Sequence, residues 1–564
     1  MKFNLVLFCL FTMGFVNISL SQSLSSVIHL PNSQTSEVRA VRMDDNHNVY
    51  VAGSFDGTLQ LGNSNMSAVG QKDGFLAKFD SQGTCIWSQN IGTSNTDKLN
   101  DLVLDENGNI YVCGYFNANS PNDNDKYLPV LNSTGDTSKV IKFDSNGNQI
   151  WSISFSGGNS NTVSLSYKNN EIVVVGYFSG SVNFGATPSG NPVSTSINGF
   201  IGKISSSGNI SWIKLIGSTG ATCYATDVVI DSNNNIYVNG SFSGTGYFNP
   251  NSTSFTLGSV GGVDVFHMCL NSSGNFIWAN SFGSSTSSSG GTANDRSRGM
   301  ALDNQNNIIS VGRMAGDMDV NPNSGTYNLF SSDGTGYLLK MNSSGNFIWG
   351  RNLRSENYDV TTDALGNIYY TGTIGAGQTD FDLSGGTNIL SSLTGNSFLS
   401  KINSAGNFLY VYLSSSTNQS DQLRSTCISF ENNGELCHAG DFIGTAVLDN
   451  FVNSPLFSDS GSKDGIVYKF LSGFVTTNMN TLLDENLLWL FPNPNSGNFY
   501  ISISDLGFSD KVQVIVENPL GQRVFNSIVT ENLNVVNSWG GKGLHIVRLI
   551  DSNNNMVCRK VLLQ

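Results

Sequence analysis

The chain has 564 residues, of which only 12% are charged, and 28 Lys and Arg face 42 Asp and Glu, for a formal net charge of -14. Because an average soluble chain is about 25% charged, the surface must consist mainly of Ser, Asn, Thr and Gly. An acidic chain without a basic run repels phosphate backbones, which argues against nucleic acid as a partner. Aromatic and β-branched residues alternate with polar ones in short runs, which indicates half-buried strands and argues against disorder.

The N-terminus predicts an export signal over residues 1–21. Lys2 supplies the positive start, Phe3–Val16 the apolar stretch, and Ser19–Ser21 a small-x-small cleavage site before Gln22. The alternative is a membrane anchor, but an apolar run of about 14 residues is short of the roughly 20 that span a bilayer. No later segment is long enough either, so we expect no transmembrane segment.

One strand motif then recurs seven times, and each copy ends in glycine. The glycines are spaced 61, 62, 64, 72, 60 and 68 residues apart. The copies read HNVYVAGSF (Gly53), GNIYVCGYF (Gly114), NEIVVVGYF (Gly176), NNIYVNGSF (Gly240), NNIISVGRM (Gly312), GNIYYTGTI (Gly372) and GELCHAGDF (Gly440). A repeat of this period predicts an architecture of seven near-identical units.

Each unit is expected to fold as a four-stranded antiparallel meander. In residues 225–283 the alternating runs predict strands over Val228–Asp231, Ile236–Phe242, Val263–Asn271 and Phe276–Phe282. Asn, Ser and Gly clusters between these runs predict turns.

Two residue types recur at fixed places in the units. The fourth strand carries Trp87, Trp151, Trp212, Trp278, Trp349 and, in the sixth copy, Tyr410. We interpret these rings as packing against the neighbouring unit, although a row of sugar-stacking platforms is an alternative. Nine residues before the glycine stand Asp44, Asp105, Asp231, Asp303 and Asp363, which we interpret as turn residues that accept a hydrogen bond from the backbone two residues on.

The two ends of the repeat region predict how it closes. The seventh unit runs through a third strand, Gly465–Phe470, and lacks a fourth. Ser25–Leu30, followed by Asn32–Glu37, matches the fourth strand and following loop of the first unit. The N-terminal strand is therefore expected to complete the last blade and leave no exposed edge. The prediction is an all-β, seven-bladed β-propeller over residues 22–473.

The units resemble the bacterial SBBP-like β-propeller repeats of exported proteins. The shared patterns are D-x-x-x-N-hydrophobic-Y-V-x-G at Asp105–Gly114, D-G-F-x-x-K within Lys72–Lys78 and G-N-x-x-W at Gly274–Trp278. The resemblance covers about residues 24–473 and implies the fold; propellers host many unrelated activities, so it implies no particular function.

Composition changes after the repeats, which predicts a linker over residues 474–487 and a small β-sandwich over 488–564. Short alternating strands are punctuated by Pro and Gly in Leu490–Gly497, Val512–Val524, Gly543–Leu549 and Arg559–Gln564. These blocks resemble the type A C-terminal sorting domain of the type IX secretion system of Bacteroidetes, with His545 where a Tyr is usual. The resemblance implies the secretion machinery as a partner, removal of the domain, and a secreted or outer cell-surface location. The alternative is a generic terminal sandwich.

Cysteines and histidines give no sign of a disulfide framework, a zinc site or a catalytic triad. Seven cysteines follow the signal: Cys85, Cys113, Cys223, Cys269, Cys427, Cys437 and Cys558. They are scattered without a CxxC pair, and a Cys427–Cys437 bridge would join residues two positions out of direct opposition. The five histidines are isolated and outside HxH, HExxH or GxSxG motifs, so no catalytic residue is predicted.

Two sets of carboxylates are candidates for a cation site, with calcium as the possible ion and no other cofactor expected. Thirteen residues before the glycine, units two, four and six carry Asp101, Asp227 and Asp359, and the other units carry Ala40, Val163, Gly299 and Cys427. Three carboxylates at a channel mouth could bind a hard cation, but solvation of a turn or strand end explains them equally well.

The second set lies in the loop after the second strand of two units. Asp317 and Asp319, and likewise Asp380 and Asp382, place oxygen ligands at alternate positions that share one face of a strand. The same spacing also arises in an exposed edge strand.

Taken together, these features favour a monomeric, secreted or cell-surface, non-catalytic protein that binds a glycan or a protein through loops on one propeller face. Enzymes need acids and bases whose environments differ, whereas the charged residues here recur mostly at turn positions. The alternative is a secreted polysaccharide-acting enzyme, a hydrolase or lyase that uses loop carboxylates.

Overall fold

The computed structural model describes residues 23–471 apart from gaps at 63, 119–136, 186–192, 218–219, 221, 289, 332–334, 384, 393–394, 416–421, 432–433 and 449–456, and in addition the strands between Trp489 and Leu563. The predicted signal lies outside the described residues. The described elements are all strands and fall into two compact units that divide after Leu471. None of them is a helix long and apolar enough to cross a membrane.

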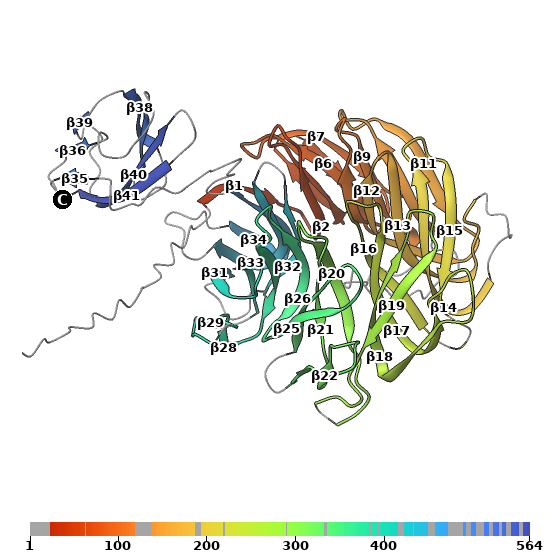
Figure 1. Ribbon diagram of the computed structural model, residues 1–564. Helices are drawn as coiled ribbons and strands as arrows, with labels where there is room; N and C mark the ends of the chain where they lie inside the picture. Colours follow the sequence, from red (N-terminus) through yellow and green to blue (C-terminus); the bar gives the residue numbers. More distant parts are fainter. Residues whose placement is uncertain are drawn as a thin grey trace, which may run out of the picture. The chain divides into compact units, whose positions relative to one another are not determined.

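The first unit is a ring of seven antiparallel four-stranded blades, which confirms the predicted seven-bladed propeller (Figure 1). From the inner strand outward, blade 1 is β2 (Ser36–Met43), β3 (Val49–Phe55), β6 (Asp73–Phe79) and β7 (Cys85–Ile91); blade 2 is β8 (Thr96–Leu104), β9 (Ile110–Ala118), β10 (Thr137–Phe143) and β11 (Gln149–Phe155); blade 3 is β12 (Asn159–Lys168), β13 (Glu171–Ser181), β14 (Val193–Ser205) and β15 (Ile210–Ile216).

The same order holds in the remaining blades. Blade 4 is β16 (Thr222–Ile230), β17 (Ile236–Tyr247), β18 (Thr256–Leu270) and β19 (Phe276–Phe282); blade 5 is β20 (Arg296–Leu302), β21 (Ile308–Arg313), β24 (Gly336–Met341) and β25 (Phe347–Leu353); blade 6 is β26 (Glu356–Thr362), β27 (Ile368–Ile374), β30 (Asn396–Ile402) and β31 (Phe408–Ser415); blade 7 is β32 (Gln422–Phe430), β33 (Leu436–Leu448), β34 (Phe457–Leu471) and β1 (Ser23–Leu30).

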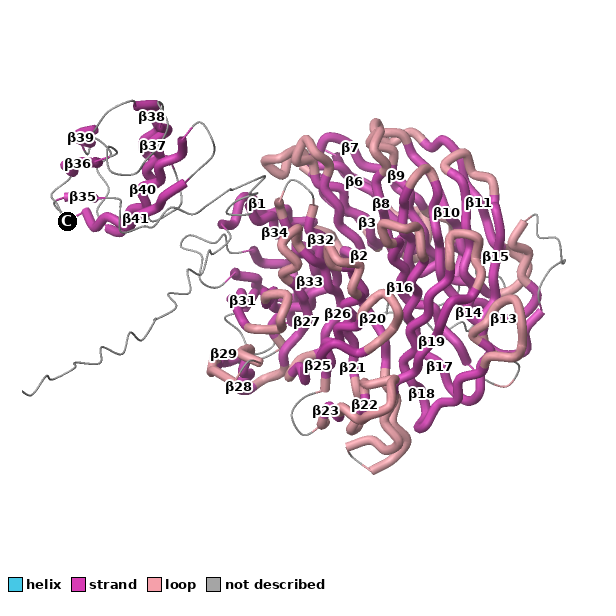
Figure 2. Tube along the Cα trace, in the orientation of Figure 1, coloured by secondary structure: helices cyan, strands magenta, loops and turns pink. Residues whose placement is uncertain are grey.

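Short hairpins lie between the second and third strands of three blades, and those of blades 5 and 6 are labelled in Figure 2. They are β4 (Thr58–Leu61) with β5 (Ser64–Ser67), β22 (Met318–Asp319) with β23 (Asn328–Leu329), and β28 (Gly377–Asp380) with β29 (Ile389–Ser392). In blade 4 the second and third strands are themselves prolonged, so that both run beyond the predicted strand ends.

The N-terminal strand closes the ring as predicted. β1 pairs antiparallel with β34 from Ser23 opposite Leu471 to Leu30 opposite Gly465. Leu30 is fully buried, and its carbonyl oxygen accepts a 2.8 Å hydrogen bond from the Ser36 hydroxyl, which in turn accepts one from the Gly465 N–H. The closing strand therefore shares both a core and a hydrogen-bond ladder with the last blade.

The recurrent glycine of the second strand lies opposite the start of a β-bulge in the inner strand. In every blade it pairs with the residue immediately before the bulge, for example Gly53 with Val38 and Gly240 with Ala225. A Cβ atom on Gly240 would lie 2.0 Å from the Tyr224 carbonyl oxygen, and the other six glycines show the same approach at 1.9 to 2.1 Å. A larger residue cannot fit against this carbonyl, which explains why glycine occupies this place in every blade.

The recurrent Asp organises the hairpin between the first two strands, as predicted. The Asp231 carboxylate accepts hydrogen bonds from the backbone N–H groups of Asn233 and Asn235, from the Asn235 amide, and from the Tyr237 hydroxyl at 3.1 Å. The backbone and asparagine contacts repeat at Asp44, Asp105, Asp303 and Asp363, and the tyrosine contact repeats at all of these but Asp303, where Ile309 takes the place of the tyrosine. At these four aspartates a lysine of the third strand lies 2.9 to 3.8 Å away.

The tryptophans of the outer strands pack against the next blade, which confirms the first interpretation of their role. The Trp151 indole N–H donates to the Ser206 carbonyl oxygen at 3.1 Å, and a Cβ on Gly208 would touch the ring at 3.2 Å. Trp87, Trp278 and Trp349 make the equivalent hydrogen bond to the third-to-fourth-strand turn of their neighbours.

The second unit consists of two antiparallel sheets. One contains β35 (Trp489–Phe491), β36 (Asn498–Ser502) and β39 (Leu533–Val536), and the other has the order β38 (Arg523–Val529), β37 (Val512–Glu517), β40 (Gly543–Asp551) and β41 (Met556–Leu563). Val514, Ile515 and Val516 on β37 are buried. The small β-domain is present, and the packing of its sheets into a sandwich stays a prediction.

Gly240→Ala tests the close approach between the second strand and the bulge. The added methyl would collide with backbone that cannot rotate away, so we expect the urea midpoint to fall by an amount equivalent to about 1–3 kcal/mol. Gly375→Ala is the control, since a Cβ there meets no atom within 4 Å. Equal midpoints for the two variants would contradict this explanation.

Removing residues 23–30 tests the closure. The deletion exposes the edge of β34 and removes the buried side chains of Ile28 and Leu30, and each such loss costs about 2–5 kcal/mol. We expect a clearly lower unfolding midpoint together with concentration-dependent association in size-exclusion chromatography. The substitution Gln34→Ala at an exposed position should change neither, and a deletion variant that stays monomeric at the wild-type midpoint would refute the closure.

Candidate functional site at the channel mouth

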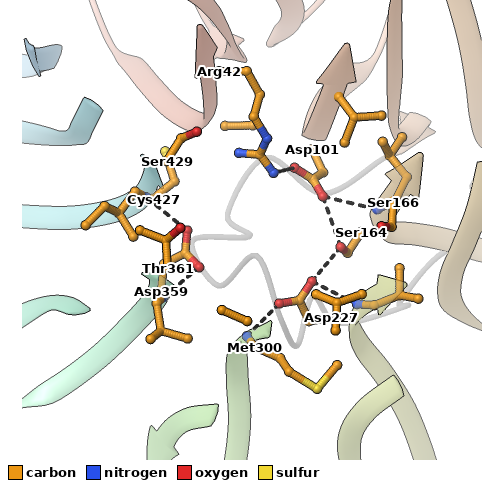
Figure 3. Close-up of a pocket in the computed structure, with 18 of the residues that line it drawn as sticks. Arg42, Asp101, Ser164, Ser166, Asp227, Met300, Asp359, Thr361, Cys427 and Ser429 are labelled. Carbon is orange, nitrogen blue, oxygen red and sulfur yellow. Dashed lines mark hydrogen bonds and ion pairs between the residues drawn. The ribbon is translucent and has the colours of Figure 1, made fainter. Parts of the chain in front are cut away.

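A cavity of about 430 Å³ opens at the end of the central channel where the inner strands terminate. All seven inner strands contribute to its lining, and Figure 3 shows side chains from successive blades pointing toward one another around it. The three aspartates predicted at a channel mouth, Asp101, Asp227 and Asp359, all lie here. Each follows the bulge of its inner strand, which turns the carboxylate toward the neighbouring blade.

Asp101 joins blades 1, 2 and 3. Its Oδ2 accepts hydrogen bonds from the Ser164 hydroxyl at 3.0 Å and the Leu165 backbone N–H at 3.1 Å. Its Oδ1 accepts one from the N–H of Leu102 and lies 3.6 Å from the Arg42 guanidinium. Both oxygens are therefore engaged.

Asp227 makes the equivalent connection from blade 4. Its Oδ1 lies 2.7 Å from the Ser164 hydroxyl oxygen, whose single proton is shared between Asp101 and Asp227. The same Oδ1 accepts a hydrogen bond from the N–H of Val228, and Oδ2 accepts one from the Met300 N–H of blade 5 at 2.8 Å.

Asp359 of blade 6 makes the third connection. Its Oδ1 accepts a hydrogen bond from the N–H of Val360, and its Oδ2 accepts one from the Ile428 N–H of blade 7 at 2.9 Å. Three carboxylates thus link blades 2 to 7 in pairs, and Ser164 bridges the first two.

Arg42 is the cation that lies among these carboxylates. Burial alone would lower its pKa, but the negative charges of Asp101, Glu431 and Asp359 outweigh that effect and raise the pKa. The guanidinium therefore stays protonated and offsets part of the negative charge at the mouth. Glu431 also accepts a hydrogen bond from the Ser429 hydroxyl, so the seventh blade contributes to the same network.

In two blades the residue that follows the bulge and faces the cavity is not the one thirteen positions before the recurrent glycine. In blade 3 the residue after the bulge is Ser164, whereas the residue thirteen positions before the glycine is Val163. The two differ because the hairpin between the first two strands has a turn of only two residues, Asn169 and Asn170, both with positive φ. In blade 5 the bulge contains two residues, so Met300 follows it. Gly299 then lies in the bulge, where a Cβ would be 2.7 Å from Asp359.

The other candidate carboxylates lie in two separate hairpins. Asp319 accepts hydrogen bonds from the N–H groups of Asn321 and Tyr327 in the β22–β23 hairpin of blade 5. Asp380 accepts from the N–H groups of Asp382 and Asn388 in the β28–β29 hairpin of blade 6.

Asp317, next to the first of these hairpins, accepts from the Ser331 N–H at 2.8 Å. Each pair therefore stays within its own blade. Across the described residues no group of three or more His, Cys, Asp or Glu is arranged to hold a metal ion, and calcium at either hairpin or at the ring stays a prediction.

The described thiols and buried histidines belong to the core. The six cysteines within the described part of the propeller form no disulfide; they are Cys85, Cys113, Cys223, Cys269, Cys427 and Cys437. Cys427 pairs with Ala439 and Cys437 with Ser429, which confirms the offset of two positions. Burial lowers the pKa of both His267 and His438 to about 3, so neither is charged at neutral pH. The side chain of Cys558 lies outside the described residues.

Sequence comparisons agree with both parts of the fold. Residues 86–120 and 211–246 match the β-propeller repeat family SBBP, and residues 489–564 match the secretion system C-terminal sorting domain. The chain therefore carries SBBP propeller repeats and a type IX sorting domain, a domain that marks proteins exported to the cell surface or the extracellular space.

A curated relative is the uncharacterized WD repeat-containing protein L264 of Acanthamoeba polyphaga mimivirus, 25% identical over 339 residues that cover 49% of this chain and 24% of the relative. The match thus spans about a quarter of that protein. Similar solved structures include a protein of unknown function from Bacteroides caccae (10% identity, 60% of this chain, 89% of the other, TM-score 0.31) and BamB from Moraxella catarrhalis (12%, 59%, 82%, 0.27).

Asp227→Ala tests the structural role of the ring. The substitution leaves the Met300 N–H without its acceptor and removes one of the two carboxylates around the Ser164 hydroxyl, so we expect the unfolding midpoint to fall by an amount equivalent to about 1–3 kcal/mol. Asp45→Ala, at an exposed turn position, serves as the control. If both variants unfold at the wild-type midpoint, the ring does not hold the blades together.

Proposed function

We propose that this protein is an exported, non-catalytic binding propeller that engages a glycan or a protein at the face around the channel mouth. The observation that carries the proposal is the cavity itself, which receives side chains from every blade and opens at one end of a closed ring. Ligand sites commonly occupy such a concave convergence of several structural elements.

The environment of the mouth carboxylates favours binding over catalysis. General acid–base catalysis needs two titratable groups whose surroundings push their pKa values apart. Asp101, Asp227 and Asp359 instead share one kind of environment, in which backbone N–H groups of their own and the next blade donate to both oxygens. They support the walls of the cavity. A cation at this ring would have to share those oxygens with the N–H donors.

The polar and aromatic groups of the wall suit a saccharide or a polar peptide. Ser166 and Thr361 present half-buried hydroxyls, and the half-buried rings of Tyr167 and Phe430 line the same cavity. Tyr167 stacks on Tyr111 with ring centroids 5.5 Å apart, and its hydroxyl donates to Glu106 at 2.7 Å. A ring held in this way can offer its face to a ligand at little entropic cost.

An array of glycans and extracellular-matrix proteins, probed with the full chain after signal removal, tests this proposal. We expect saturable binding to at least one member and no release of reducing sugar from the bound polysaccharide. Tyr167→Ala should weaken that binding at least tenfold, since it removes an ordered aromatic contact. Tyr247→Ala, an exposed tyrosine on the outer part of blade 4, should leave it unchanged.

Product release by the wild-type protein would replace the binding proposal with the hydrolase or lyase alternative. Binding that ignores Tyr167→Ala would place the ligand away from the mouth. Repeating the array with calcium and with a chelator tests the cation prediction separately. A calcium-dependent signal that is lost in the Asp380→Asn variant would locate the ion at the blade 6 hairpin.

A further inference from the structure

The third strand of blade 2 departs from the packing of the other six blades. In each blade one residue of the third strand pairs with the recurrent glycine of the second strand. That residue is aromatic in five blades and isoleucine in blade 7, and all six side chains are buried: Phe75, Phe200, Phe266, Tyr337, Phe398 and Ile466. In blade 2 the residue that pairs with Gly114 is Lys139.

The aromatic ring at this position packs over the glycine and fills the space beside it. A Cβ atom on Gly240 would lie 2.5 Å from the Phe266 ring, and one on Gly312 would lie 2.7 Å from Tyr337. Because Lys139 carries no ring, blade 2 lacks this cover.

A cavity of about 520 Å³ lies beside Lys139, in the outer part of the junction between blades 1 and 2. We call it the outer cavity. It is lined by the fourth strand of blade 1, β7, and by β10 and β11 of blade 2, which are labelled in Figure 2. Its volume is within the range of about 300–1,000 Å³ that is common for ligand pockets. The mouth cavity and the outer cavity share no lining residue, so they are separate sites.

Lys139 gives the outer cavity a positive charge. The lining, all of it within the described residues, contains this lysine but no aspartate or glutamate. The Lys139 Nζ lies 4.5 Å from the centroid of the Phe116 ring, and it forms no ion pair with the described residues. The side chain is half-buried, and partial burial strengthens the attraction of its ammonium group for an anion. The outer cavity therefore favours a ligand that carries a negative charge.

Neutral polar side chains surround this ammonium group. Gln89 lines the cavity from blade 1, and Gln149 and Ser152 line it from blade 2. Within the described part of the chain these three side chains make no hydrogen bond. At the junction of blades 4 and 5, by contrast, Asn280 takes the place of Gln89 and its amide donates to the Gly345 carbonyl oxygen at 2.9 Å. The fold thus leaves two amides and a hydroxyl of the outer cavity for a ligand.

Apolar side chains complete the lining. Ile91 of β7, and Ile141 and Phe143 of β10, belong to the core that blades 1 and 2 share. A sugar ring offers C–H groups to such an apolar surface and hydroxyl groups to amides. Several neutral donors and acceptors around one cation therefore favour a carboxylate that has hydroxyl groups beside it over the carboxylate of an acidic peptide.

We propose that the outer cavity is a second binding site, which takes a uronate residue of an acidic polysaccharide. The carboxylate of the sugar pairs with Lys139, and its hydroxyl groups form hydrogen bonds with Gln89, Gln149 and Ser152. The C–H face of the sugar lies against Ile91. This site does not depend on the ligand of the mouth, and it adds an acidic ligand to the proposed function.

Oligogalacturonate, alginate oligomers and glucuronoxylan oligomers, titrated into the full chain after signal removal, test the proposal with three kinds of uronate. We expect saturable binding of at least one of them. Methyl esterification of its carboxyl groups keeps the sugar backbone and removes the charge, so it should weaken binding about tenfold or more. Lys139→Gln should weaken binding by a similar factor. The control Lys214→Gln removes the same charge from the outer strand of blade 3 and should have little effect.

Lys139→Phe separates the loss of binding from a loss of folding. It restores the residue type found in four other blades, and the ring should fill part of the cavity. We therefore expect the urea midpoint to stay at or above the wild-type value while uronate binding is lost. A Lys139→Phe variant that still binds the uronate would refute the site.

Other outcomes would also overturn the proposal. Equal binding of the free and esterified oligomers would show that charge is not recognised. Sodium acetate that binds as tightly as the oligomers would restrict the site to a free carboxylate, and polyglutamate that binds more tightly than every uronate would assign it to an acidic peptide.

The mouth and the outer cavity are distinguished by one more variant. Tyr167→Ala should leave uronate binding intact, and a loss there would place the acidic ligand at the mouth. Failure of all three uronates, together with binding of a neutral glycan that Tyr167→Ala weakens, would leave the proposed function standing and refute only the second site.

Discussion

The contact between each recurrent glycine and the carbonyl group of a bulged inner strand is the constraint on which this propeller depends. The second strand can lie within hydrogen-bonding distance of the bulge only if its residue there has no side chain, as the 2.0 Å approach at Gly240 illustrates. The bulge in turn rotates the residue that follows it toward the channel. One packing requirement, repeated seven times, therefore sets both the blade geometry and the residues that face the central cavity.

Hydrogen bonds hold neighbouring blades together at two distances from the propeller axis. Near the axis, hydrogen bonds run from backbone N–H groups of the following blade to the carboxylates of Asp101, Asp227 and Asp359. Near the rim, tryptophans such as Trp151 donate to a turn of the next blade. The recurrent aspartates of the turns and the three aspartates near the axis therefore let a chain with few charges use them to fix its architecture.

Charged side chains gather at two places along the inner strands. At one end Arg42 lies among carboxylates whose oxygens are occupied by N–H donors, which makes that ring a support for a polar cavity. Nearer the start of the inner strands, the Glu37 carboxylate forms buried ion pairs with Lys72 and Lys98.

The sequence by itself determined the propeller, its seven units, the closing strand and the sorting domain, because each rests on local patterns: glycine period, strand alternation, turn residues and motif blocks. It also placed Asp101, Asp227 and Asp359 at the channel. Only the tertiary structure decided that Ser164 and Met300 complete the ring, since a one-residue change in a turn or a bulge shifts which side chain faces inward.

The buried ion pairs of Glu37 with Lys72, Lys98 and Lys463 were equally invisible to sequence reasoning. Glu37 and Lys463 are 426 residues apart, and they meet because closing the ring brings the first and last blades together. No local pattern records which side chains a closed ring makes neighbours, and the balance of buried charge between them follows only from that closure.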